Sequence, residues 1–445
     1  MTYDVMVIGA GSGGLAAAKA AAAYGAKVAI AESNQPGGTC VNRGCIPKKL
    51  MVQAATFVEH QQIAKAHGWT NPDGAFAWDT LKSTIDQHLE KLRQSQRQTL
   101  QEANVEIIAG SAQLINAHTV AVGDREIQAK HIIIATGSQP MLSDMPGIEL
   151  ALTSRDMFQL DQLPKHLAIV GGGYIGVEFG CMLAQLGTRI TLIDTDAQVL
   201  SGFDPDLRAF VQERLQRLGI HFIAQAACKE IETNGSALRL SLSGEHTQSA
   251  TADAVLMAVG RTPNVELLGL EDAGVELNDG YVAVDDYGQT TQDSVYAIGD
   301  CVGRLPLTPV AIAEGKAVAQ TICQQQPTTV DYRWIPSAVF STPPVASVGW
   351  SETVAKEHIG DDVETICHSF TSLSHSLMDD PQQSLIKLVL CKSSRQVLGV
   401  HIGGKQAPNL IQGIIPALRR KLTLDELTNT PGIHPTSGEE LFALV

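Results

Sequence analysis

Cys40 and Cys45 are the residues of this sequence best suited to chemistry, and four residues separate them. We expect both at the start of one helix, facing the same side of its first turn. A helix N-terminus lowers the pKa of a thiol, so one of them can persist as a nucleophilic thiolate. Two unrelated buried cysteines and half of a zinc site are the alternatives. Zinc would need two further ligands at metal spacing, and the sequence supplies no second Cys or His pair for it.

Two glycine-rich segments with the same organisation lie about 160 residues apart. In each, an apolar run predicts a strand (residues 5–8 and 167–170), glycines follow in the pattern G-x-G-x-x-G, and a helix comes next. A second strand (residues 27–31 and 189–193) then ends at an acid, Glu32 or Asp194. This is the βαβ dinucleotide-binding unit, present twice. Two copies predict two dinucleotides, and we expect a flavin and a nicotinamide.

Each part of the unit has a physical role. The first glycine makes the turn, and the second, Gly11 or Gly173, lets a pyrophosphate approach the backbone at a helix N-terminus. Glu32 and Asp194 would accept hydrogen bonds from the adenosine ribose hydroxyls. A 2′-phosphate would need a nearby cation, but residues 193–198 contain Asp194 and Asp196 and no Arg or Lys. We therefore predict a preference for NADH over NADPH; the alternative is that both acids are merely solvated turn residues.

The rest of the chain predicts the elements that hold these sites. A long amphipathic helix is expected over residues 78–102, followed by short strands near Val105, Val120 and residues 132–135. After the second βαβ unit, strands alternate with turns as far as residues 295–300, and a helix begins near Thr308. A Pro-containing stretch at residues 334–344 marks a boundary, beyond which we expect an α+β domain with strands near residues 345, 385 and 397 and helices near 410 and 424.

Composition narrows the class of protein. The 445 residues are 44 % hydrophobic and carry a formal charge of −15, which argues against a nucleic-acid or anionic-membrane surface. The N-terminal residues lead directly into a strand with no basic secretory n-region, and no apolar stretch reaches the roughly 20 residues that span a bilayer. We expect a soluble, cytoplasmic protein whose six other cysteines are reduced small hydrophobes.

The cysteine segment resembles the redox-active disulfide motif of the class I flavoprotein disulfide reductases, most closely that of the glutathione reductases. The resemblance covers nearly the whole chain: it includes the first glycine motif, residues 134–137, 171–178 and 297–300, and the C-terminal His434-Pro435-Thr436-Ser437-Gly438-Glu439-Glu440. Pro47-Lys48-Lys49 and this C-terminal stretch are similar to glutathione reductases, whereas lipoamide dehydrogenases usually differ at both places.

The resemblance implies roles for individual residues. Cys40 would be the interchange thiol that attacks the substrate, and Cys45 would lie nearer the flavin as the charge-transfer thiolate. Lys48 and Glu178 would pair near the flavin N5 and steady the charge as hydride arrives.

The resemblance also implies the cofactor contacts. Asp300 would bind the ribitol or pyrophosphate region of FAD, and Tyr174 would cover the nicotinamide face of the flavin until the dinucleotide displaces it. The residues expected to bind FAD are Gly9, Gly11, Ser12, Gly13, Gly14, Glu32, Gly38, Thr39, Thr136, Gly137, Asp300 and Thr308. Those expected to bind the nicotinamide cofactor are Gly171, Gly173, Tyr174, Ile175, Gly176, Asp194 and Gly260.

In this family His434 would reach into the site of the partner subunit, oriented by Glu439, so the active unit would be a homodimer. The chemistry agrees, because thiol–disulfide exchange needs a group that takes a proton from Cys40 and returns one to the leaving thiol. A neighbouring carboxylate would fix the imidazole tautomer and favour its charged form. The alternative is a satisfied structural histidine.

The substrate is expected to be a small anionic disulfide. Glutathione reductases place arginines against the glutathione carboxylates, and the matching positions here are Lys19 and Lys316, which keep the charge but lose the bidentate fork. Both can equally be solvated surface lysines. The tyrosine lid expected on the long helix is also absent, since that region reads Arg93-Gln94-Ser95-Gln96. These departures leave room for a modified glutathione such as glutathione amide.

The sequence therefore predicts an α/β fold with two Rossmann-like dinucleotide-binding domains and a C-terminal α+β dimerisation domain. An FAD-binding domain (residues 1–142 and 261–332) would be split around an NAD(P)-binding domain (143–260), with a dimerisation domain at 333–445. The predicted activity is electron transfer from NADH, through FAD and the Cys40–Cys45 disulfide, to glutathione disulfide or a relative, without metal. A dihydrolipoamide dehydrogenase-like enzyme and a non-catalytic flavin redox sensor are the alternatives; mercuric ion reductase is disfavoured because the chain end carries no cysteine pair.

Overall fold

The computed structural model describes residues 2–70, 74–244 and 249–444, which form two compact units. The first unit contains residues 1–48, 80–141 and 261–331, and the second contains residues 49–79, 142–260 and 332–445. Each unit therefore gathers segments that are far apart in the sequence.

The first unit is built on a seven-stranded sheet in the order β3-β2-β1-β6-β5-β4, with β18 also paired to β6. Its parallel part, β3-β2-β1-β6 together with β18, carries the dinucleotide motif, and β4, β5 and the start of β6 form an antiparallel meander. The strands are β1 Thr2–Ile8, β2 Val28–Glu32, β3 Glu106–Ala109, β4 Ala112–Asn116, β5 Thr119–Val122, β6 Arg125–Ile134 and β18 Val295–Ala297. The helices of this unit are α1 Ser12–Ala23, α2 Gly38–Arg43, nearly all of α4 Trp78–Glu102, and α7 Thr308–Gln324.

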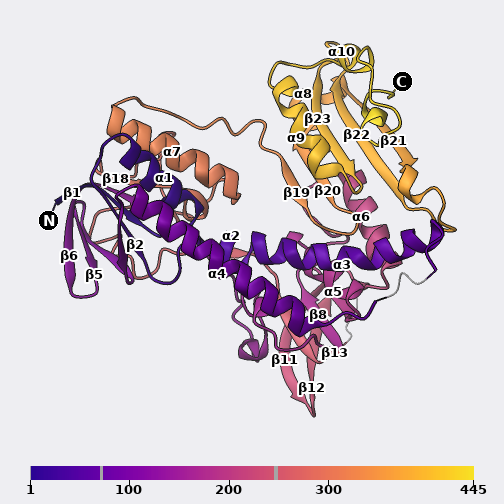
Figure 1. Cartoon of the computed structure of the whole chain (residues 1–445), viewed down its shortest axis with the longest axis horizontal. Helices are drawn as coiled ribbons and strands as arrows, with labels where there is room; N and C mark the ends of the chain where they lie inside the picture. The colour runs from indigo at the N-terminus through magenta and orange to yellow at the C-terminus, as the bar shows by residue number, and fades with distance from the viewer. Residues whose placement is uncertain (1, 71–73, 245–248, 445) are drawn as a thin grey trace. The chain divides into compact units, whose positions relative to one another are not determined.

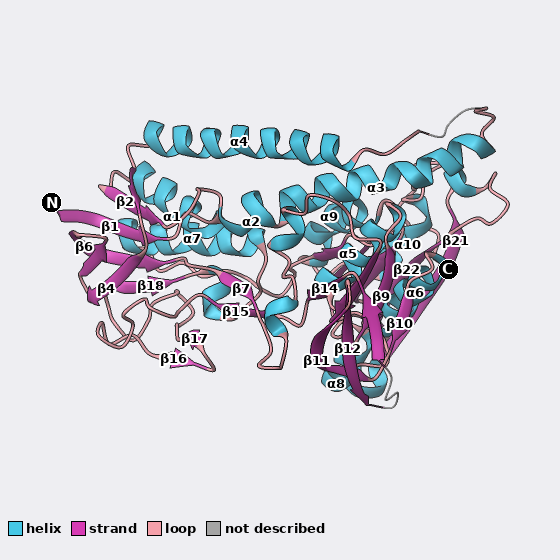
Figure 2. Ribbon diagram, turned by 90° about the horizontal axis from the view of Figure 1, so that it is seen from below, coloured by secondary structure: helices cyan, strands magenta, loops and turns pink. Residues whose placement is uncertain are grey.

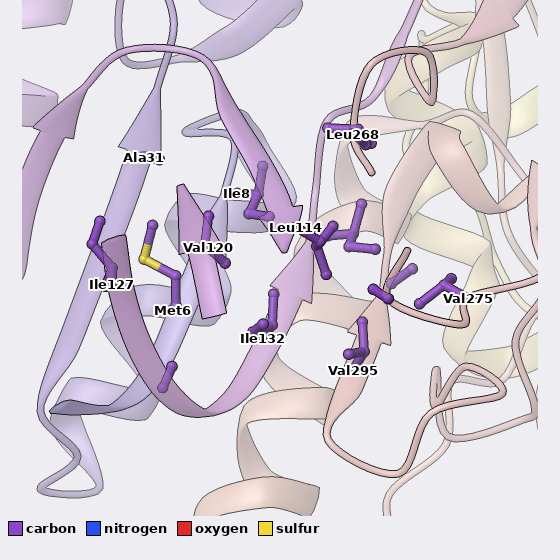
Figure 3. Packing of buried hydrophobic residues seen from close by; sticks show 14 of the residues in the cluster. Met6, Ile8, Ala31, Leu114, Val120, Ile127, Ile132, Leu268, Val275 and Val295 are labelled. Carbon is purple, nitrogen blue, oxygen red and sulfur yellow. The ribbon is translucent and has the colours of Figure 1, made fainter. Parts of the chain in front are cut away.

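Each face of this sheet has its own hydrophobic core, because successive side chains of β1 point to opposite faces. Val5 and Val7 point to the face that α1 and α7 cover, where the two helices lie side by side (Figures 1 and 2). Met6 and Ile8 point to the opposite face and pack against the meander and residues 268–282 (Figure 3). Because β1 is buried on both sides, its carboxyl end is held rigidly where the glycine turn begins.

The second unit contains another parallel sheet, in the order β10-β9-β8-β14, and an antiparallel β11-β12-β13 meander. The parallel strands are β8 His166–Val170, β9 Arg189–Ile193, β10 His221–Ile223 and β14 Ala254–Met257, with helices α5 Tyr174–Gln185 and α6 Pro205–Arg217. The meander strands are β11 Ala226–Asn234, β12 Ala237–Gly244 and β13 Ser249–Ala252. A strand order of this kind is that of a mononucleotide-binding half of a doubly wound fold.

The C-terminal part of this unit is a five-stranded antiparallel sheet, β19-β20-β23-β22-β21, with three helices. The strands are β19 Ser337–Val339, β20 Val345–Gly349, β21 Val363–Thr371, β22 Gln383–Cys391 and β23 Val397–Gly403, and the helices are α8 Glu352–Ile359, α9 Ala407–Leu418 and α10 Leu424–Thr428. The core of this part is formed by the sheet with α9 and α10. The predicted strands and helices of this region are present, while β19, β21 and α8 were not predicted.

A buried ion cluster joins α6 to this sheet within the second unit. Lys387 of β22 is fully buried, and its ammonium group lies 2.9 Å from Asp204, 2.5 Å from Asp206 and 2.7 Å from Glu352. Asp204 is also the N-cap of α6 and accepts from the backbone N–H of Asp206. Asp204 thus supplies a hydrogen-bond acceptor to the N-terminus of α6 and a negative charge to the buried ammonium group of Lys387.

Among the described residues no helix is both long and apolar enough to cross a lipid bilayer. The proposed division of the chain at residues 142, 260 and 332 stays a prediction.

Candidate active site

The two cysteines lie on different helices, and the expectation that they share the first turn of one helix is wrong. Cys40 is in the short helix α2, and Cys45 is the first residue of α3 Cys45–Ala66. Gly44 separates the helices with a non-helical backbone (φ −155°, ψ −118°), and a Cβ there would lie 2.8 Å from the carbonyl oxygen of Thr39. The spacing of five positions is thus produced by a break in the chain rather than by one helical turn.

This arrangement makes the two free thiols unequal. The pKa of Cys45 is lowered to about 6, mainly by a hydrogen bond from the Cys40 thiol and further by the Thr308 hydroxyl and the Lys48 ammonium group. The Thr308 Oγ1 lies 3.7 Å from the Cys45 sulfur, and Thr308 is the first residue of α7. Two helix N-termini therefore meet at this sulfur. The hydrogen bond to Cys45, together with burial, raises the pKa of Cys40, so Cys45 is the thiolate and Cys40 keeps its proton.

The cysteine segment is fastened to the first glycine turn. The backbone N–H of Gly37 donates to the carbonyl of Ala10 at 2.8 Å, and a Cβ on Gly38 would lie 2.6 Å from the Cα of Gly11. Gly38 also has a φ of +59°, in the left-handed region that favours glycine. The helix that carries Cys40 therefore begins at a backbone segment, Gly37-Gly38, that packs against the turn expected to bind pyrophosphate.

The first turn itself fits a dinucleotide. Gly9 has a φ of +102°, and a Cβ there would lie 2.5 Å from the carbonyl oxygen of Ala135. The first turn of α1 contains no acidic residue, and no side chain caps it. The hydroxyl of Thr136 is buried and makes no hydrogen bond within residues 2–70, 74–244 and 249–444. Free backbone donors and an orphaned hydroxyl beside them suit a bound diphosphate.

Glu32, which was expected to bind ribose, also braces this turn. Its Oε2 accepts from the backbone N–H of Ala10 at 2.7 Å, and its Oε1 accepts from that of Asn34 at 2.8 Å. A carboxylate has about four acceptor positions, so two bonds leave capacity for ribose hydroxyls.

Asp300 lies in a polar network that the sequence did not reveal. It is the second residue of a short 3₁₀ turn, Gly299–Val302, and accepts from the Ser138 hydroxyl at 2.5 Å. Arg261 donates to the same hydroxyl at 2.8 Å and to the Ser138 carbonyl at 2.7 Å. Asn264 bonds the carbonyl of Thr136 at 2.9 Å. Arg261 and Asn264 carry no motif signal, because their partners are more than 120 positions away.

The second glycine turn repeats the same construction. Gly171 has a φ of +112°, and a Cβ there would lie 2.3 Å from the carbonyl of Ala258. Asp194 accepts from the backbone N–H of Gly172 and, at 2.7 Å, from that of Asp196. Gly173 precedes the uncapped helix α5, whose first turn contains no acid. These features fit a second dinucleotide.

Four further residues were predicted for the nicotinamide site, three at the start of α5 and one after β14. Tyr174 and Ile175 begin α5, and Gly176 packs so closely that a Cβ would lie 2.0 Å from the Gly171 carbonyl. Gly260, beyond β14, has a φ of +133°. Arg208 was not predicted to lie near the loop after β9, but its guanidinium donates to the carbonyls of Val199 and Gln198 at 2.9 and 2.8 Å.

His434 and Glu439 are brought together as expected. The imidazole Nδ1 lies 3.0 Å from Glu439 Oε2 and 3.2 Å from Oε1, and Glu439 also accepts from the backbone N–H of Thr436 at 3.0 Å. Thr436 and His434 together lower the pKa of the Glu439 carboxyl. With Nδ1–H directed to a carboxylate, Nε2 is the nitrogen available for proton exchange, and the side chain is 83 % exposed.

Lys48 and Glu178 belong to different units, and their pairing stays a prediction. Glu178 is buried on α5, and its Oε1 accepts from the backbone N–H of Phe340 at 2.8 Å. Lys48 stands one turn after Cys45 on α3 and contributes to the low pKa of that thiol. This contribution is separate from the role expected of Lys48 near the flavin N5, which stays a prediction.

Lys19 and Lys316 lie on the paired helices α1 and α7. The helices approach closely where a Cβ on Gly315 would lie 2.5 Å from the carbonyl oxygen of Gly13. Lys19 is half-buried and Lys316 is exposed. Both cations thus belong to the helix pair whose N-termini face the glycine turn and the cysteines.

Comparison with known proteins identifies the family. The family model described as pyridine nucleotide-disulphide oxidoreductase matches residues 3–315, and that of the dimerisation domain of the same family matches residues 335–444. The chain belongs to the pyridine nucleotide-disulphide oxidoreductases. It is 42 % identical to the glutathione reductase of Nostoc sp. (99 % of each chain covered) and 38 % identical to that of Burkholderia cepacia (99 % and 98 %). It is 37 % identical to the chloroplastic/mitochondrial glutathione reductase of Pisum sativum, covering 99 % of this chain and 82 % of that protein.

These findings confirm the predicted fold class and the resemblance to class I disulfide reductases close to glutathione reductase. This oxidoreductase is an NAD(P)H-dependent flavoprotein with a redox-active disulfide. The family implies FAD as its flavin, and the dimerisation domain supports a homodimer that acts on a small disulfide.

Proposed function

We propose that this oxidoreductase reduces glutathione disulfide or a modified glutathione, with NADH as its preferred electron donor. The observation that carries the proposal is the unequal thiol pair, with Cys45 as the thiolate and Cys40 as the protonated thiol beside the first glycine turn. A pair with one stabilised thiolate is suited to exchange with a disulfide rather than to a structural bond.

FAD, held by the first glycine turn and Asp300, would accept a hydride from the nicotinamide and pass two electrons to the Cys40–Cys45 disulfide. In the resulting dithiol, Cys40 loses its proton to the partner subunit's His434 and attacks one sulfur of the substrate. The substrate S–S bond breaks, and the same imidazole returns the proton to the departing thiolate. The Cys45 thiolate then attacks the Cys40 sulfur of the mixed disulfide, which re-forms the Cys40–Cys45 bond. The second product thiol leaves with a proton from solvent, so two electrons and two protons are consumed.

The glutathione assignment draws on two kinds of support. The relatives at 42 %, 38 % and 37 % identity are named glutathione reductases. Lys19 and Lys316 supply cations for the carboxylates of an anionic disulfide, although neither offers a bidentate fork. Glutathione amide carries fewer carboxylates, so single-point cations would suit it as well.

The preference for NADH rests on the loop after β9. Asp194 is held in place by two backbone donors, and Asp196 adds a second carboxylate. Arg208 of α6 reaches this loop, where its guanidinium donates to two backbone carbonyls. Fixed negative charge at residues 193–198, which contain no Arg or Lys, disfavours a 2′-phosphate. A cytoplasmic location stays a prediction.

The decisive experiment compares NADH and NADPH oxidation by the FAD-containing protein with glutathione disulfide as acceptor. Faster turnover at limiting NADH than at limiting NADPH is expected. Turnover with NADPH alone would contradict the proposal that Asp194 and Asp196 disfavour a 2′-phosphate, but it would leave the enzyme class unchanged. Activity only with glutathione amide disulfide would move the substrate to the modified form. Rapid NAD reduction by dihydrolipoamide, with neither glutathione form reduced, would favour the lipoamide dehydrogenase alternative. Negligible turnover with every disulfide would favour a sensor.

A further inference from the structure

Helix α4 contacts the cysteine segment at a residue that lies between the two cysteines. The Nε of Arg93 donates to the Oδ1 of Asn42 at 2.7 Å. Asn42 in turn donates through Nδ2 to the carbonyls of Gly38 at 2.9 Å and Gln35 at 3.1 Å. The bond to Gly38 spans four positions and closes the turn that carries Cys40. Both ends of the Asn42 amide are thus used, one to hold the turn and one to receive Arg93.

Helix α2 has only six residues, too few to be stable through its own backbone bonds. Side-chain contacts such as those of Asn42 and Arg93 must therefore stabilise this helix. Arg93 is itself well fixed, because it also donates to Glu90 at 3.3 Å and its side chain is only 24 % exposed. A charged donor strengthens the bond to the amide oxygen and selects one orientation of the amide.

One turn further along α4, Arg97 provides a natural comparison. It donates to the side chain of Gln35 and lies 3.7 Å from Glu90. Gln35 precedes both cysteines, and its backbone carbonyl also accepts from Asn42, so Arg97 reaches Asn42 only through Gln35, whereas Arg93 bonds the amide directly. An effect of net charge on α4 should therefore be shared equally by Arg93 and Arg97, whereas an effect through Asn42 should be larger for Arg93.

From these contacts we infer that Arg93 is a positioning residue for thiol–disulfide exchange: it holds Asn42, and Asn42 holds the turn that places Cys40 against Cys45. The inference rests on the proposed function, because it assigns Arg93 a role in the exchange reaction. It also predicts that the effect arises from geometry, since the Nε of Arg93 bonds Asn42 and not a cysteine sulfur.

The test uses the FAD-containing dimer and three variants: Arg93→Met, Arg93→Lys and the matched control Arg97→Met. The first measurement is the equilibrium between the Cys40–Cys45 dithiol and disulfide in dithiothreitol redox buffers, read by mass spectrometry after alkylation. Loosening the turn lowers the effective concentration of one thiol at the other. We expect the equilibrium constant for disulfide closure to fall about fivefold or more in Arg93→Met and to stay within about twofold in Arg97→Met.

Arg93→Lys keeps the charge but cannot reproduce the planar Nε donor, so it should resemble Arg93→Met. The second measurement is disulfide-dependent kcat, which should fall about 10- to 100-fold in Arg93→Met with little change in KM, because a small displacement of a reacting atom is costly. Oxidation of the reduced flavin by ferricyanide, which bypasses the cysteines, should be unchanged.

Equal closure constants for Arg93→Met and Arg97→Met would overturn the inference, and so would full rescue by Arg93→Lys, which would assign the effect to charge. The dithiothreitol equilibrium needs neither the nicotinamide nor the substrate. If the parent protein reduces no disulfide with NADH or NADPH, the proposed function fails, while the closure measurement still decides the positioning of Cys40.

Discussion

The thiolate character of Cys45 can be tested through the residue that contributes most to it. The Cys40 thiol is the first cause of the lowered Cys45 pKa, ahead of Thr308 and Lys48. Cys40→Ser keeps a hydroxyl donor at the same place, and Cys40→Ala removes the donor while leaving a side chain of similar size. Both variants prevent formation of the disulfide, so the titration of Cys45 can be followed alone.

The expected magnitude follows from the hydrogen bond. A hydrogen bond to a charged group contributes about 1.5–3 kcal/mol, and about 1.4 kcal/mol corresponds to one pKa unit. Cys45 is exposed in the isolated chain, so the lower end of this range applies. From a pKa of about 6, the pKa of Cys45 should stay near 6 in the serine variant and rise by about one in the alanine variant. At pH 7 the thiolate fraction would then fall from about 90 % to about 50 %.

The assay is the ultraviolet absorbance of the thiolate as a function of pH, in the FAD-containing protein, with the Cys40→Ala, Cys45→Ser double variant as the blank. Two results would refute the reasoning. Equal midpoints in the serine and alanine variants would show that the bond from Cys40 does not stabilise the thiolate. A midpoint near 9 in the serine variant would show that the helix ends and Lys48 do not stabilise it either.

Three other predictions follow from the structure. His434→Gln should lower disulfide turnover by about 10²–10⁴-fold without slowing flavin reduction by the nicotinamide, and stopped-flow rates that fall together would contradict its role. Lys387→Met should cost about 3–5 kcal/mol of unfolding free energy in urea, because it removes the ammonium group that pairs with the buried carboxylate of Asp204. The pKa of Glu352 is lowered to about 2 by Lys356 and then Lys387, so its stabilisation is present above its ordinary value of 4.5 and is lost as pH falls toward 2. The variant should be less sensitive to acid in that window, and an unchanged acid profile would exclude the pairing. Gly315→Ala would place a Cβ 2.5 Å from a backbone oxygen of α1 and should weaken FAD retention. The control Gly413→Ala on α9 has open space around its Cβ and should be neutral or stabilise the protein by up to about 1 kcal/mol. Equal FAD content in the two purified variants would contradict this prediction.

The sequence predicted the elements with strong periodicity almost to the residue. The helix at residues 78–102 and the strand at residues 189–193 have the predicted bounds, because amphipathic spacing and a buried apolar run determine them locally. It missed β21, whose residues 363–371 mix exposed and buried positions, and α8, which is only eight residues long. Both depend on packing against β22, which no local pattern reveals.

The site was predicted best where a motif carries it and worst where distant residues meet. The spacing of Cys40 and Cys45 suggested one helical turn, but Gly44 divides the segment into two helices, so that Cys40 lies in the first turn of α2 and Cys45 is the first residue of α3. The contact of Thr308 with Cys45 spans 263 positions and brings a second helix end to the sulfur. Such contacts follow from the packing of α1 against α7 and leave no signal in either segment alone.

The two acids at the ends of β2 and β9 show how one motif residue can serve two purposes. In each copy the carboxylate accepts from the backbone N–H that follows the first glycine, at Ala10 or Gly172, and from a second N–H two positions after the acid. The acid is therefore part of the turn before any ligand binds, and its charge is fixed where the adenosine ribose is expected. At Asp194 a carboxylate held by two donors cannot turn away from a 2′-phosphate without releasing the glycine turn. The proposed preference for NADH therefore rests on a charge that the fold keeps in place.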